Sequence, residues 1–400
     1  MLPARAVVTA PPDAIFGLNE TFAADPRAEK VTVVEGVYVD ERGEAPVLDS
    51  VREAERRLAE ETTNKMYLPM VGTGTFRSAA SRFVFGPSST IPDTGRAAIA
   101  QAPGGTGALR VAADFLFQTG GARTAWVPQP TWPNHPQVFR CAGFHIERYP
   151  YVDKTGCNID REGLLATLSS AAAGDVVVLH ACCHNPTGMD PSIELWHEIA
   201  DVIVARQLFP VVDFAYQGFG RGIREDAEWL TAFDRPDLEF AICSSFSKNF
   251  SLYNERVGAV SVVCVDPDRA DAALSNLKIA IRANYSNPPT HGSSVVSTIL
   301  GDPALKVQWE RELAYMRGRI QSNRASLVDA LRKQRVAGDW SRIGEQRGLF
   351  AYLALSDEQV TRLREDWAIY MVGGGRINVA AVTPGNAGRI AEAVGAVVDR

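Results

Sequence analysis

The 400-residue chain has few cysteines, and their arrangement indicates neither a disulfide framework nor a metal site. There are six, two of them adjacent at Cys182 and Cys183, and no pair has the Cys-x-x-Cys spacing. A chain of this length buries enough apolar surface to fold without covalent cross-links. We therefore expect reduced thiols, most of them buried as small apolar side chains, and no bound metal.

Long hydrophobic runs and an excess of positive charge are also lacking. The longest apolar runs, such as residues 176–179, have the length of a strand, and the N-terminus lacks the continuous apolar segment of a signal peptide. Lysine and arginine total 41 against 47 aspartate and glutamate, and no basic block is longer than a few residues. We therefore expect a cytoplasmic protein without a membrane anchor, and no nucleic acid as its main partner.

The order of apolar and polar residues predicts an α/β protein with two lobes. Between about residues 101 and 261, short β-rich runs alternate with helical stretches, which is typical of a mostly parallel sheet covered on both faces. A long amphipathic helix, apolar every three or four positions from Leu305 to Leu331, should connect this lobe to a smaller α+β lobe. We predict an N-terminal arm (1–12), a small domain (13–45 and 316–400) and a large domain (46–315). The candidate strands of the large sheet are 125–127, 145–149, 176–180, 209–213, 241–245 and 257–265, and strands near 349–353 and 377–379 belong to the small lobe.

A glycine-rich segment, residues 104–107, precedes a helical pattern that runs from Gly107 to Phe117. Backbone N–H groups at a helix N-terminus, together with a threonine hydroxyl, can hold a phosphate. Glycines also occur in turns for conformational reasons alone, so the segment by itself leaves both explanations open. It is not a Walker motif, and Arg110 stands where a dinucleotide-binding Gly-x-Gly-x-x-Gly pattern needs its last glycine.

Lys248 lies among residues that suit an aldehyde cofactor with a phosphate group. The hydroxyls of Ser245 and Ser247 precede it, and the guanidinium of Arg256 follows eight residues later. All three groups can donate hydrogen bonds to one phosphate. Asp213, at the end of a predicted strand, would keep a pyridine nitrogen protonated. These residues predict a pyridoxal phosphate site with Lys248 as its amine.

Two further side chains are expected at the same edge of the sheet. Asn185 follows the strand predicted at 176–180, where ligands of open α/β sheets bind, and Tyr216 follows Asp213 by three residues. Both can form a hydrogen bond with a ring oxygen of the cofactor. Each residue alone has a plainer explanation, since Asn-Pro-Thr-Gly is a turn sequence, Asp213 could cap a helix and Tyr216 could lie in the core. Their joint occurrence favours the cofactor site.

With these residues and several longer motifs, the chain resembles the class I, fold type I pyridoxal phosphate-dependent aminotransferases of the aspartate and aromatic amino acid family, over nearly its whole length. The resemblance implies the fold type I transferase architecture, with a large pyridoxal phosphate-binding domain built on a mostly parallel sheet, a smaller α+β domain and a homodimer. The motifs that carry it are residues 103–110, 132–135, 182–188, 213–219, 253–258 and 282–289.

The resemblance also implies a role for each matching residue. Lys248 would bond covalently to the cofactor aldehyde and then move a proton between the substrate Cα and the cofactor, while Asp213 would pair with the ring nitrogen. Arg376 would grip the substrate α-carboxylate, a bidentate task suited to a guanidinium. His135 and His180 should lie near Asp213. The remaining cofactor contacts would be Asn185 and Tyr216 at the phenolic oxygen, Trp132 against the ring, Gly105, Thr106, Ser245, Ser247 and Arg256 at the phosphate, and Tyr67 from the partner subunit.

Substrate specificity is predicted from the side chains that would surround the substrate, which include Gly36, Trp132 and Asn185. Arg282 matches the residue that, in this family, crosses the dimer interface to bind a distal carboxylate. Val39, Ala45 and Met66 stand where strict aspartate enzymes usually carry polar residues, and a less polar pocket admits an aromatic ring at lower cost. We therefore expect ping-pong transamination that moves the amino group of tyrosine, phenylalanine and also aspartate to 2-oxoglutarate.

Glu35 departs from the family pattern, which usually has an aliphatic residue before Gly36. Because this segment lines the substrate side of the site, the carboxylate of Glu35 could bind a cationic donor such as arginine. It could also turn to solvent or pair with an arginine side chain, since an unpaired carboxylate in a closed pocket is costly. The alternative function is therefore a specialised biosynthetic aminotransferase acting on a cationic or modified amino acid.

Overall fold

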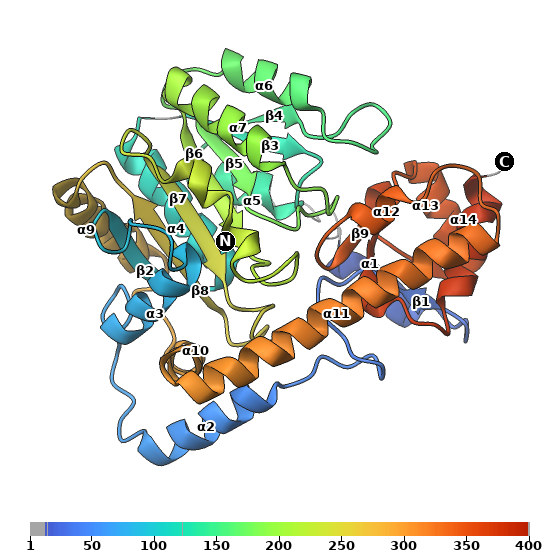
Figure 1. Cartoon of the computed structure of the whole chain (residues 1–400), viewed down its shortest axis with the longest axis horizontal. Coiled ribbons are helices and arrows are strands. Elements are labelled where there is room, and N and C mark those ends of the chain that lie inside the picture. Colours follow the sequence, from blue (N-terminus) through green and yellow to red (C-terminus); the bar gives the residue numbers. More distant parts are fainter. Residues whose placement is uncertain (1–12, 14, 122, 399–400) are drawn as a thin grey trace, which may run out of the picture.

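The computed structural model describes residues 13, 15–121 and 123–398, and its largest element is a seven-stranded sheet (Figure 1). The strand order is β2-β8-β7-β6-β5-β3-β4; β8 runs antiparallel to both of its neighbours, and the other neighbouring pairs are parallel. This mostly parallel sheet confirms the predicted α/β class. The strands are β2 (Ala97–Pro103), β3 (Thr124–Gln129), β4 (His145–Pro150), β5 (Val176–His180), β6 (Phe209–Phe214), β7 (Phe240–Ser245) and β8 (Val257–Val263).

The six candidate strands of this sheet are confirmed, with small differences at their ends. β5 has the predicted bounds, whereas β8 ends at Val263, two residues before the predicted end. β2 has no counterpart among the predicted strands. Its sequence, Ala-Ala-Ile-Ala-Gln-Ala-Pro, is rich in alanine and poor in the β-branched residues that mark the other strands.

Helices cover both faces of the sheet (Figure 1). Alternate residues of a strand pack against the two helical layers. Val177 and Leu179 of β5 belong to one hydrophobic core, whereas Val176 and Val178 belong to the other. Burial on both faces explains why β5 is a continuous apolar run. The first core receives α3 (Gly74–Phe85), α6 (Arg161–Ser170), α7 (Ile193–Arg206) and α8 (Leu230–Phe233), and the second receives α4 (Gly104–Thr119), α5 (Asn134–Ala142) and α9 (Pro267–Asn284).

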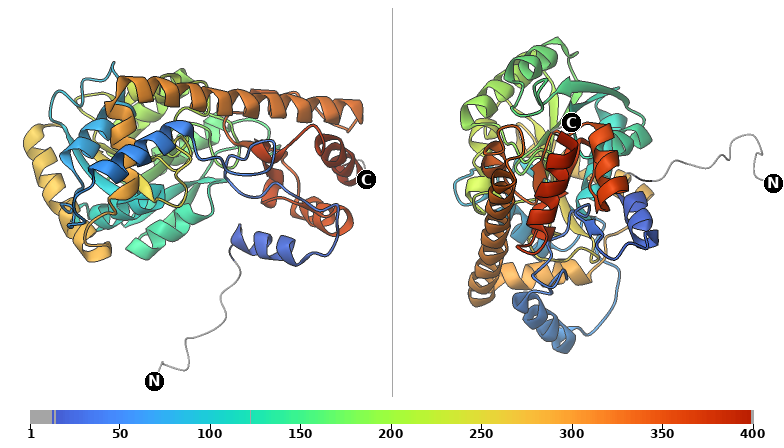
Figure 2. Two further views of the ribbon diagram at one scale, coloured as in Figure 1. Left: turned by 90° about the horizontal axis from the view of Figure 1, so that it is seen from below. Right: turned by 90° about the vertical axis from the view of Figure 1, so that its right-hand side faces the viewer.

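The long predicted helix is α11 (Pro303–Lys333), which leaves the large sheet region and continues into the smaller lobe (Figures 1 and 2). It contacts α2 (Asp49–Glu61) and α10 (His291–Gly301), and also α12 (Arg342–Glu345) and α14 (Ala387–Val398). Asp302 caps its first turn by accepting from the N–H groups of Ala304 and Leu305. The predicted connection between two lobes is therefore confirmed.

The smaller lobe joins segments from both ends of the chain. β1 (Val31–Thr32) pairs in parallel with β10 (Ile369–Tyr370), and β9 (Phe350–Tyr352) pairs antiparallel with β11 (Arg376–Asn378). The predicted domain boundaries stay a prediction, and the predicted arm at 1–12 lies outside the described residues. The other elements are α1 (Phe16–Ala24), α13 (Asp357–Trp367) and the short 3-10 helices Glu225–Ala227, Gly373–Gly375 and Val379–Ala381.

The cysteines agree with the prediction of unbridged, mostly buried thiols. All six are free, and four of them, Cys182, Cys183, Cys243 and Cys264, are buried. Across the described ranges, none of the helices combines the length and apolar character that crossing a bilayer requires.

Candidate active site

The carboxyl ends of three parallel strands bring most of the predicted residues to one edge of the sheet. His180, at the end of β5, pairs in register with Asp213 of β6, and β6 is in turn parallel with β7. Asn185 lies on the loop after β5, Tyr216 follows β6 and Lys248 follows β7. Residues that are far apart in the sequence therefore share one location, as predicted for a ligand of an open α/β sheet.

Asp213 is a buried carboxylate, and only one of its oxygens has a hydrogen-bond partner among the residues that the structure describes. Its Oδ2 lies 2.9 Å from Nε2 of His135, while the Thr131 hydroxyl lies 2.8 Å from His135 Nδ1 and 3.1 Å from His180 Nε2. Burial raises the pKa of Asp213, but the hydrogen bond and charge of His135 and the charges of His180 and Lys248 outweigh it and lower that pKa overall. The carboxylate is therefore ionised at neutral pH.

The second oxygen of Asp213 indicates what the site is built to hold. Oδ1 is buried and has no hydrogen-bond partner among the described residues. An ionised oxygen without a donor in a buried position costs free energy. A protonated ring nitrogen placed against Oδ1 would supply the missing donor, so this carboxylate fits a pyridinium cofactor.

Lys248 and Tyr216 lie beside this carboxylate. Nζ of Lys248 is 4.8 Å from the centre of the Tyr216 ring. Burial, and to a lesser degree the charge of Arg256, lowers the pKa of Lys248 against the opposing effect of Asp213. A lower pKa increases the share of neutral amine, which is the nucleophilic form. Burial raises the pKa of Tyr216, so its phenol stays protonated and can donate a hydrogen bond.

The start of α4 differs from the prediction. The helix begins at Gly104 and not at Gly107, so Gly105 and Thr106 lie within its first turn instead of in a flexible entry. Gly104 has a φ of +75°, a left-handed conformation that glycine adopts without strain, and this lets the chain leave β2 and enter the helix directly. The first turn of an α-helix leaves its N–H groups without partners inside the helix, so they can bind a ligand.

One corner of the fold combines the helix start with two serines and an arginine. A Cβ atom on Gly104 would lie 2.5 Å from Nη2 of Arg256, and one on Gly105 would lie 3.2 Å from Cβ of Ser245. Arg256 is held by hydrogen bonds from Nη1 to the Tyr253 carbonyl (2.9 Å) and the Ser247 hydroxyl (3.4 Å). Helix N–H groups, hydroxyls and a guanidinium in one corner suit a phosphate group.

Arg376 is almost fully buried, in contact with Asn185 and Phe350. It is 1% exposed, its Nη1 donates to Oδ1 of Asn185 at 3.1 Å, and its Nη2 donates to the carbonyl of Val34. The guanidinium carbon lies 4.3 Å from the centre of the Phe350 ring, and Nε has no partner within the described part of the chain. Burial lowers the pKa of Arg376 to about 10, so it remains charged at neutral pH. A buried guanidinium with an unused donor suits a carboxylate ligand.

Gly36 and Glu35 lie on the same segment but have different surroundings. A Cβ atom on Gly36 would lie 3.0 Å from Cζ of Phe350 and 3.9 Å from the Tyr216 hydroxyl, so Gly36 borders the site. Glu35 is exposed, and its Oε1 accepts from Nδ2 of Asn19 at 2.6 Å. The observed side chain is therefore turned outward, in line with the solvent-facing alternative.

Three further predicted residues, Trp132, Tyr67 and Arg282, are partly buried or exposed. Trp132 is partly buried, with its ring centre 5.3 Å from that of His135. Tyr67 is 91% exposed, and Arg282 is also exposed, with a hydrogen bond to the Ser286 hydroxyl. The exposure of Tyr67 and Arg282 is compatible with the expectation that both side chains contact the active site of a partner subunit.

The structure also shows site residues that the sequence did not indicate. Thr131 bridges His135 and His180, but a single threonine in a loop carries no recognisable pattern. The same is true of Asp190, which closes the loop after β5 by accepting from the backbone of Cys183 and His184. For Thr131 and Asp190, the sequence offers only one indication of a role in the site: each is a polar loop residue next to a recognised motif.

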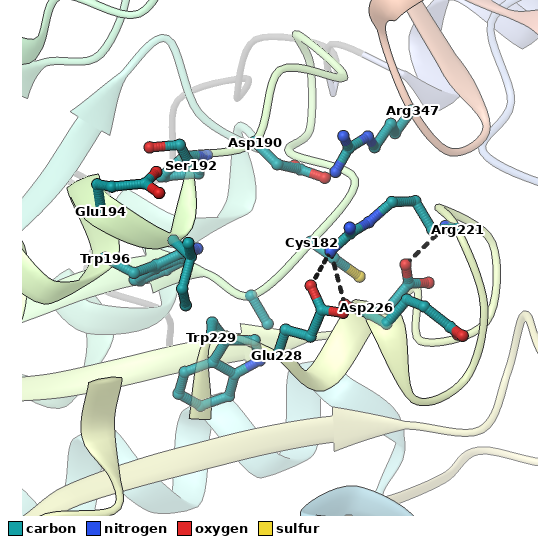
Figure 3. Close-up of a pocket in the computed structure, with 14 residues that line it drawn as sticks. Cys182, Asp190, Ser192, Glu194, Trp196, Arg221, Asp226, Glu228, Trp229 and Arg347 are labelled. Atoms are coloured by element: carbon teal, nitrogen blue, oxygen red, sulfur yellow. Dashed lines mark hydrogen bonds and ion pairs between the residues drawn. The ribbon is translucent and has the colours of Figure 1, made fainter. Parts of the chain in front are cut away.

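A cavity of about 370 Å³ lies beside that loop and outside the cluster (Figure 3). In the described residues, Cys182, Cys183 and Asp226 place one potential metal-binding atom each within 4.8 Å of the others. Asp226, however, already accepts from the N–H groups of Gly218, Gly220 and Arg221, so its position is explained by loop support. The other labelled lining residues in Figure 3 are Asp190, Ser192, Glu194, Trp196, Arg221, Glu228, Trp229 and Arg347.

Known proteins resemble this chain over nearly its whole length. The family model for aminotransferase class I and II matches residues 28–394. Aspartate aminotransferase of Salmonella typhi is 48% identical over 392 residues, covering 98% of this chain and 99% of the relative, and aromatic-amino-acid aminotransferase of Pseudomonas aeruginosa is 43% identical over 391 residues, covering 98% of both. The crystal structure of aromatic-amino-acid aminotransferase from Burkholderia pseudomallei, described as covalently bound to pyridoxal phosphate, superposes with a TM-score of 0.95 at 44% identity and full coverage of both chains. The resemblance and the fold type predicted from the sequence are therefore confirmed, and the chain belongs to the class I and II aminotransferases.

Proposed function

We propose that the protein is a pyridoxal phosphate-dependent transaminase that transfers the amino group of tyrosine, phenylalanine and aspartate to 2-oxoglutarate. The observation that carries this proposal is the buried Asp213 carboxylate: His135 holds one oxygen, and the other has no partner in the described part of the chain. Lys248 lies beside it, and the corner formed by α4 and Arg256 lies nearby. Together they offer a partner for a ring nitrogen, an amine and a phosphate site, which is the set that pyridoxal phosphate requires.

Each side chain has a distinct task toward the cofactor. With pyridoxal phosphate bound, Asp213 would keep a proton on the ring nitrogen, Asn185 and Tyr216 would hold the phenolic oxygen, and Trp132 would pack against the ring. The first turn of α4, at Gly105 and Thr106, would hold the phosphate together with Ser245, Ser247 and Arg256. When bound, pyridoxal phosphate accepts electron density from the substrate Cα, which makes the proton on that carbon removable.

Two residues act on the substrate itself. Arg376 binds the α-carboxylate, because its guanidinium is charged, buried and has an unused donor. Lys248 would act as the base that moves the Cα proton, because burial favours its neutral form. Gly36 leaves room for the substrate beside Phe350 and the Tyr216 hydroxyl.

The exposed positions of Tyr67 and Arg282 support a homodimer in which each chain completes the site of the other. The two segments are neighbours, since Nδ2 of Asn287 donates to the carbonyl of Leu68 at 3.3 Å. Arg282 would then bind the distal carboxylate of aspartate and of 2-oxoglutarate, while Tyr67 would reach the cofactor. The cytoplasmic location expected from the sequence stays a prediction.

Aromatic donors are supported by the relatives, which include proteins named tyrosine aminotransferase and aromatic-amino-acid aminotransferase at 42 to 43% identity. Val39, in place of the lysine common in strict aspartate enzymes, also favours a ring. A cationic donor finds no comparable support, because Glu35 is exposed and bonded to Asn19.

A half-reaction screen tests this function. Purified enzyme loaded with pyridoxal phosphate is mixed with single amino acids, and the loss of cofactor absorbance is followed. Fast conversion by tyrosine, phenylalanine and aspartate is expected, whereas conversion only by arginine would overturn the donor assignment. Lys248→Ala should abolish the covalent cofactor absorbance and turnover, and Lys306→Ala, an exposed lysine on α11, serves as the control. Near-normal transamination by Lys248→Ala would contradict the mechanism.

A further inference from the structure

The loop between β5 and α7 carries Asn185, and one carboxylate holds the two residues that precede it. Oδ2 of Asp190 accepts from the N–H of Cys183 and Oδ1 accepts from the N–H of His184, both at 2.9 Å. Cys183 has a φ of +52°, a left-handed conformation that is uncommon outside glycine. The carboxylate therefore stabilises a backbone turn that the side chains alone disfavour.

Asp190 does not serve α7, although that helix begins only three residues later. The cap of α7 is Ser192, whose hydroxyl accepts from the N–H of Leu195 at 3.3 Å. Both hydrogen bonds of Asp190 instead point back along the chain toward Asn185. Helix capping therefore does not explain this carboxylate.

The other side of the turn is held independently. The ring of His184 stacks on Tyr151, with 3.7 Å between centres and 7° between planes, and its Nδ1 lies 2.8 Å from the Thr187 hydroxyl. The carbonyl of Gly188 accepts from the N–H of Arg347 at 2.7 Å. The residues on both sides of Asn185 are therefore fixed by their own contacts. The remaining influence on the position of Asn185 is the backbone turn that Asp190 closes.

Asn185 transmits this position to the substrate side of the site. Its Oδ1 accepts from Nη1 of Arg376, whose Nη2 is bonded to Val34. A shift of the Asn185 amide would therefore also change the direction of the buried guanidinium. A carboxylate outside the reacting groups thus controls both a cofactor contact and a substrate contact.

We propose that Asp190 is a positioning residue for this enzyme: its two charge-assisted hydrogen bonds to the backbone set the place of Asn185 and, through it, the orientation of Arg376. The inference rests on the proposed function for the roles of these two residues. Figure 3 shows the Asp190 carboxylate beside the guanidinium of Arg347 at the edge of the cavity. The carboxylate therefore borders this cavity and not the site that it supports. Burial raises the pKa of Asp190 to about 6, and the group is still mainly ionised at neutral pH.

The test compares Asp190→Asn with Glu194→Gln. The asparagine keeps the shape but turns an amide group toward a backbone N–H, so that one hydrogen bond is lost. Glu194 lies on the same cavity wall and is exposed, and its side chain bonds at Ser192, the cap of α7, whereas Cys183 and His184 bond to Asp190. Its substitution therefore removes the same charge as a matched control. Three quantities are measured on both: cofactor affinity of the apoenzyme, the midpoint pH of the cofactor absorbance in the loaded enzyme, and KM for several amino acids.

For Asp190→Asn we expect a midpoint pH about 0.5 units or more above that of the wild type, because a displaced Asn185 donates less well to the ionised phenolic oxygen. Cofactor affinity should fall about 10-fold and KM should rise about 5-fold or more, with a smaller change in kcat. Glu194→Gln should remain within about twofold of the wild type in all three, as surface substitutions usually do.

An unchanged midpoint pH and cofactor affinity in Asp190→Asn would overturn the proposal, even if the thermal midpoint fell, because a purely structural role would move only stability. Asp190→Ala should change the midpoint pH and the cofactor affinity more than Asp190→Asn does. If the alanine variant does not fold, the result for the asparagine variant decides alone. The two proposals fail separately. Wild-type enzyme that binds pyridoxal phosphate but converts none of the expected donors would refute the donor assignment, while the absorbance and affinity would still decide the role of Asp190.

Discussion

Oδ1 of Asn185 lies 3.1 Å from Nη1 of Arg376, so the residue proposed to bind the cofactor oxygen also orients the residue proposed to bind the substrate carboxylate. Both side chains are buried, and the contact joins the loop after β5 to β11, which belong to different lobes. The proposed cofactor contact and the proposed substrate contact are therefore joined by one hydrogen bond.

Replacing Arg376 by lysine should weaken the binding of every amino acid donor. Lysine cannot form a bidentate pair with the α-carboxylate or keep the bond to Asn185, and a lost charged hydrogen bond of about 2.7 kcal/mol corresponds to a roughly 100-fold higher KM. Steady-state kinetics with tyrosine and aspartate as donors measure this change in KM. Arg389→Lys is the control, since Arg389 pairs with the exposed Glu29. A KM within threefold of the wild type would refute the assigned role.

Gly104→Ala should lower cofactor affinity by disturbing Arg256. The added Cβ would lie 2.5 Å from Nη2 of that arginine, so the guanidinium must move away from the phosphate corner. Gly121→Ala is a matched control, because Gly121 has a φ of +68° but an added Cβ would meet no described residue within 4 Å other than its chain neighbour. Both variants carry a similar backbone strain of about 1 kcal/mol. Only Gly104→Ala should show weakened reconstitution of the apoenzyme with pyridoxal phosphate, and equal effects would point to strain alone.

Mixed dimers test whether Arg282 acts on the partner's site. Each of the variants Lys248→Ala and Arg282→Ala should be poorly active with aspartate on its own. In a mixed dimer, one site receives both substitutions and the other receives neither, so random association should restore about one quarter of the wild-type aspartate activity.

The control pairs Lys248→Ala with Arg376→Ala. Arg376 contacts Asn185 of its own chain, so neither site of that mixed dimer is intact and no activity should return. Recovery in the control, or none in the test pair, would contradict the proposed sharing of residues across the dimer.

Two buried histidines should make the enzyme less stable as the pH falls. Burial lowers the pKa of His180 and His184 well below the usual value, so between about pH 6.5 and 5.5 only the unfolded chain takes up these protons. The unfolded state then binds more protons, and the free energy of unfolding decreases. The thermal midpoint measured from pH 7.5 to 5.5 should therefore fall.

His184→Phe should reduce this slope, because a phenyl ring preserves the stacking on Tyr151 and has no group to titrate. The raised pKa of Asp190 acts in the opposite sense between about pH 4 and 6, but Asp190 is present in both proteins, so the difference between them isolates His184. His145→Gln, at an exposed position, is the control. Equal slopes in wild type and His184→Phe would rule out this source of acid sensitivity.

Much of this arrangement could be predicted from the sequence, because parallel strands place their carboxyl ends together. Asp213 lies at the end of β6, Asn185 follows β5, and the apolar run of β5 marks a strand buried on both faces. The direction of Glu35 could not be predicted, because it depends on Asn19, a residue of α1 whose place is set by tertiary packing. The alanine-rich β2 could not be predicted either, because it is a strand through its pairing with β8 and not through its own β propensity.

The path of α11 limits how this enzyme can be recombined with its relatives. The helix has 31 residues, or about 46 Å at 1.5 Å per residue, and it carries the backbone without interruption from one lobe into the other. A chimera cut within it would have to match the helical phase of both parents, or every apolar contact beyond the junction would rotate away from its partner. A graft beginning after residue 333 avoids that problem but meets a second one, since its β10 must then pair with the β1 of the host. Exchange of the smaller lobe therefore requires donor sequence at both ends of the chain.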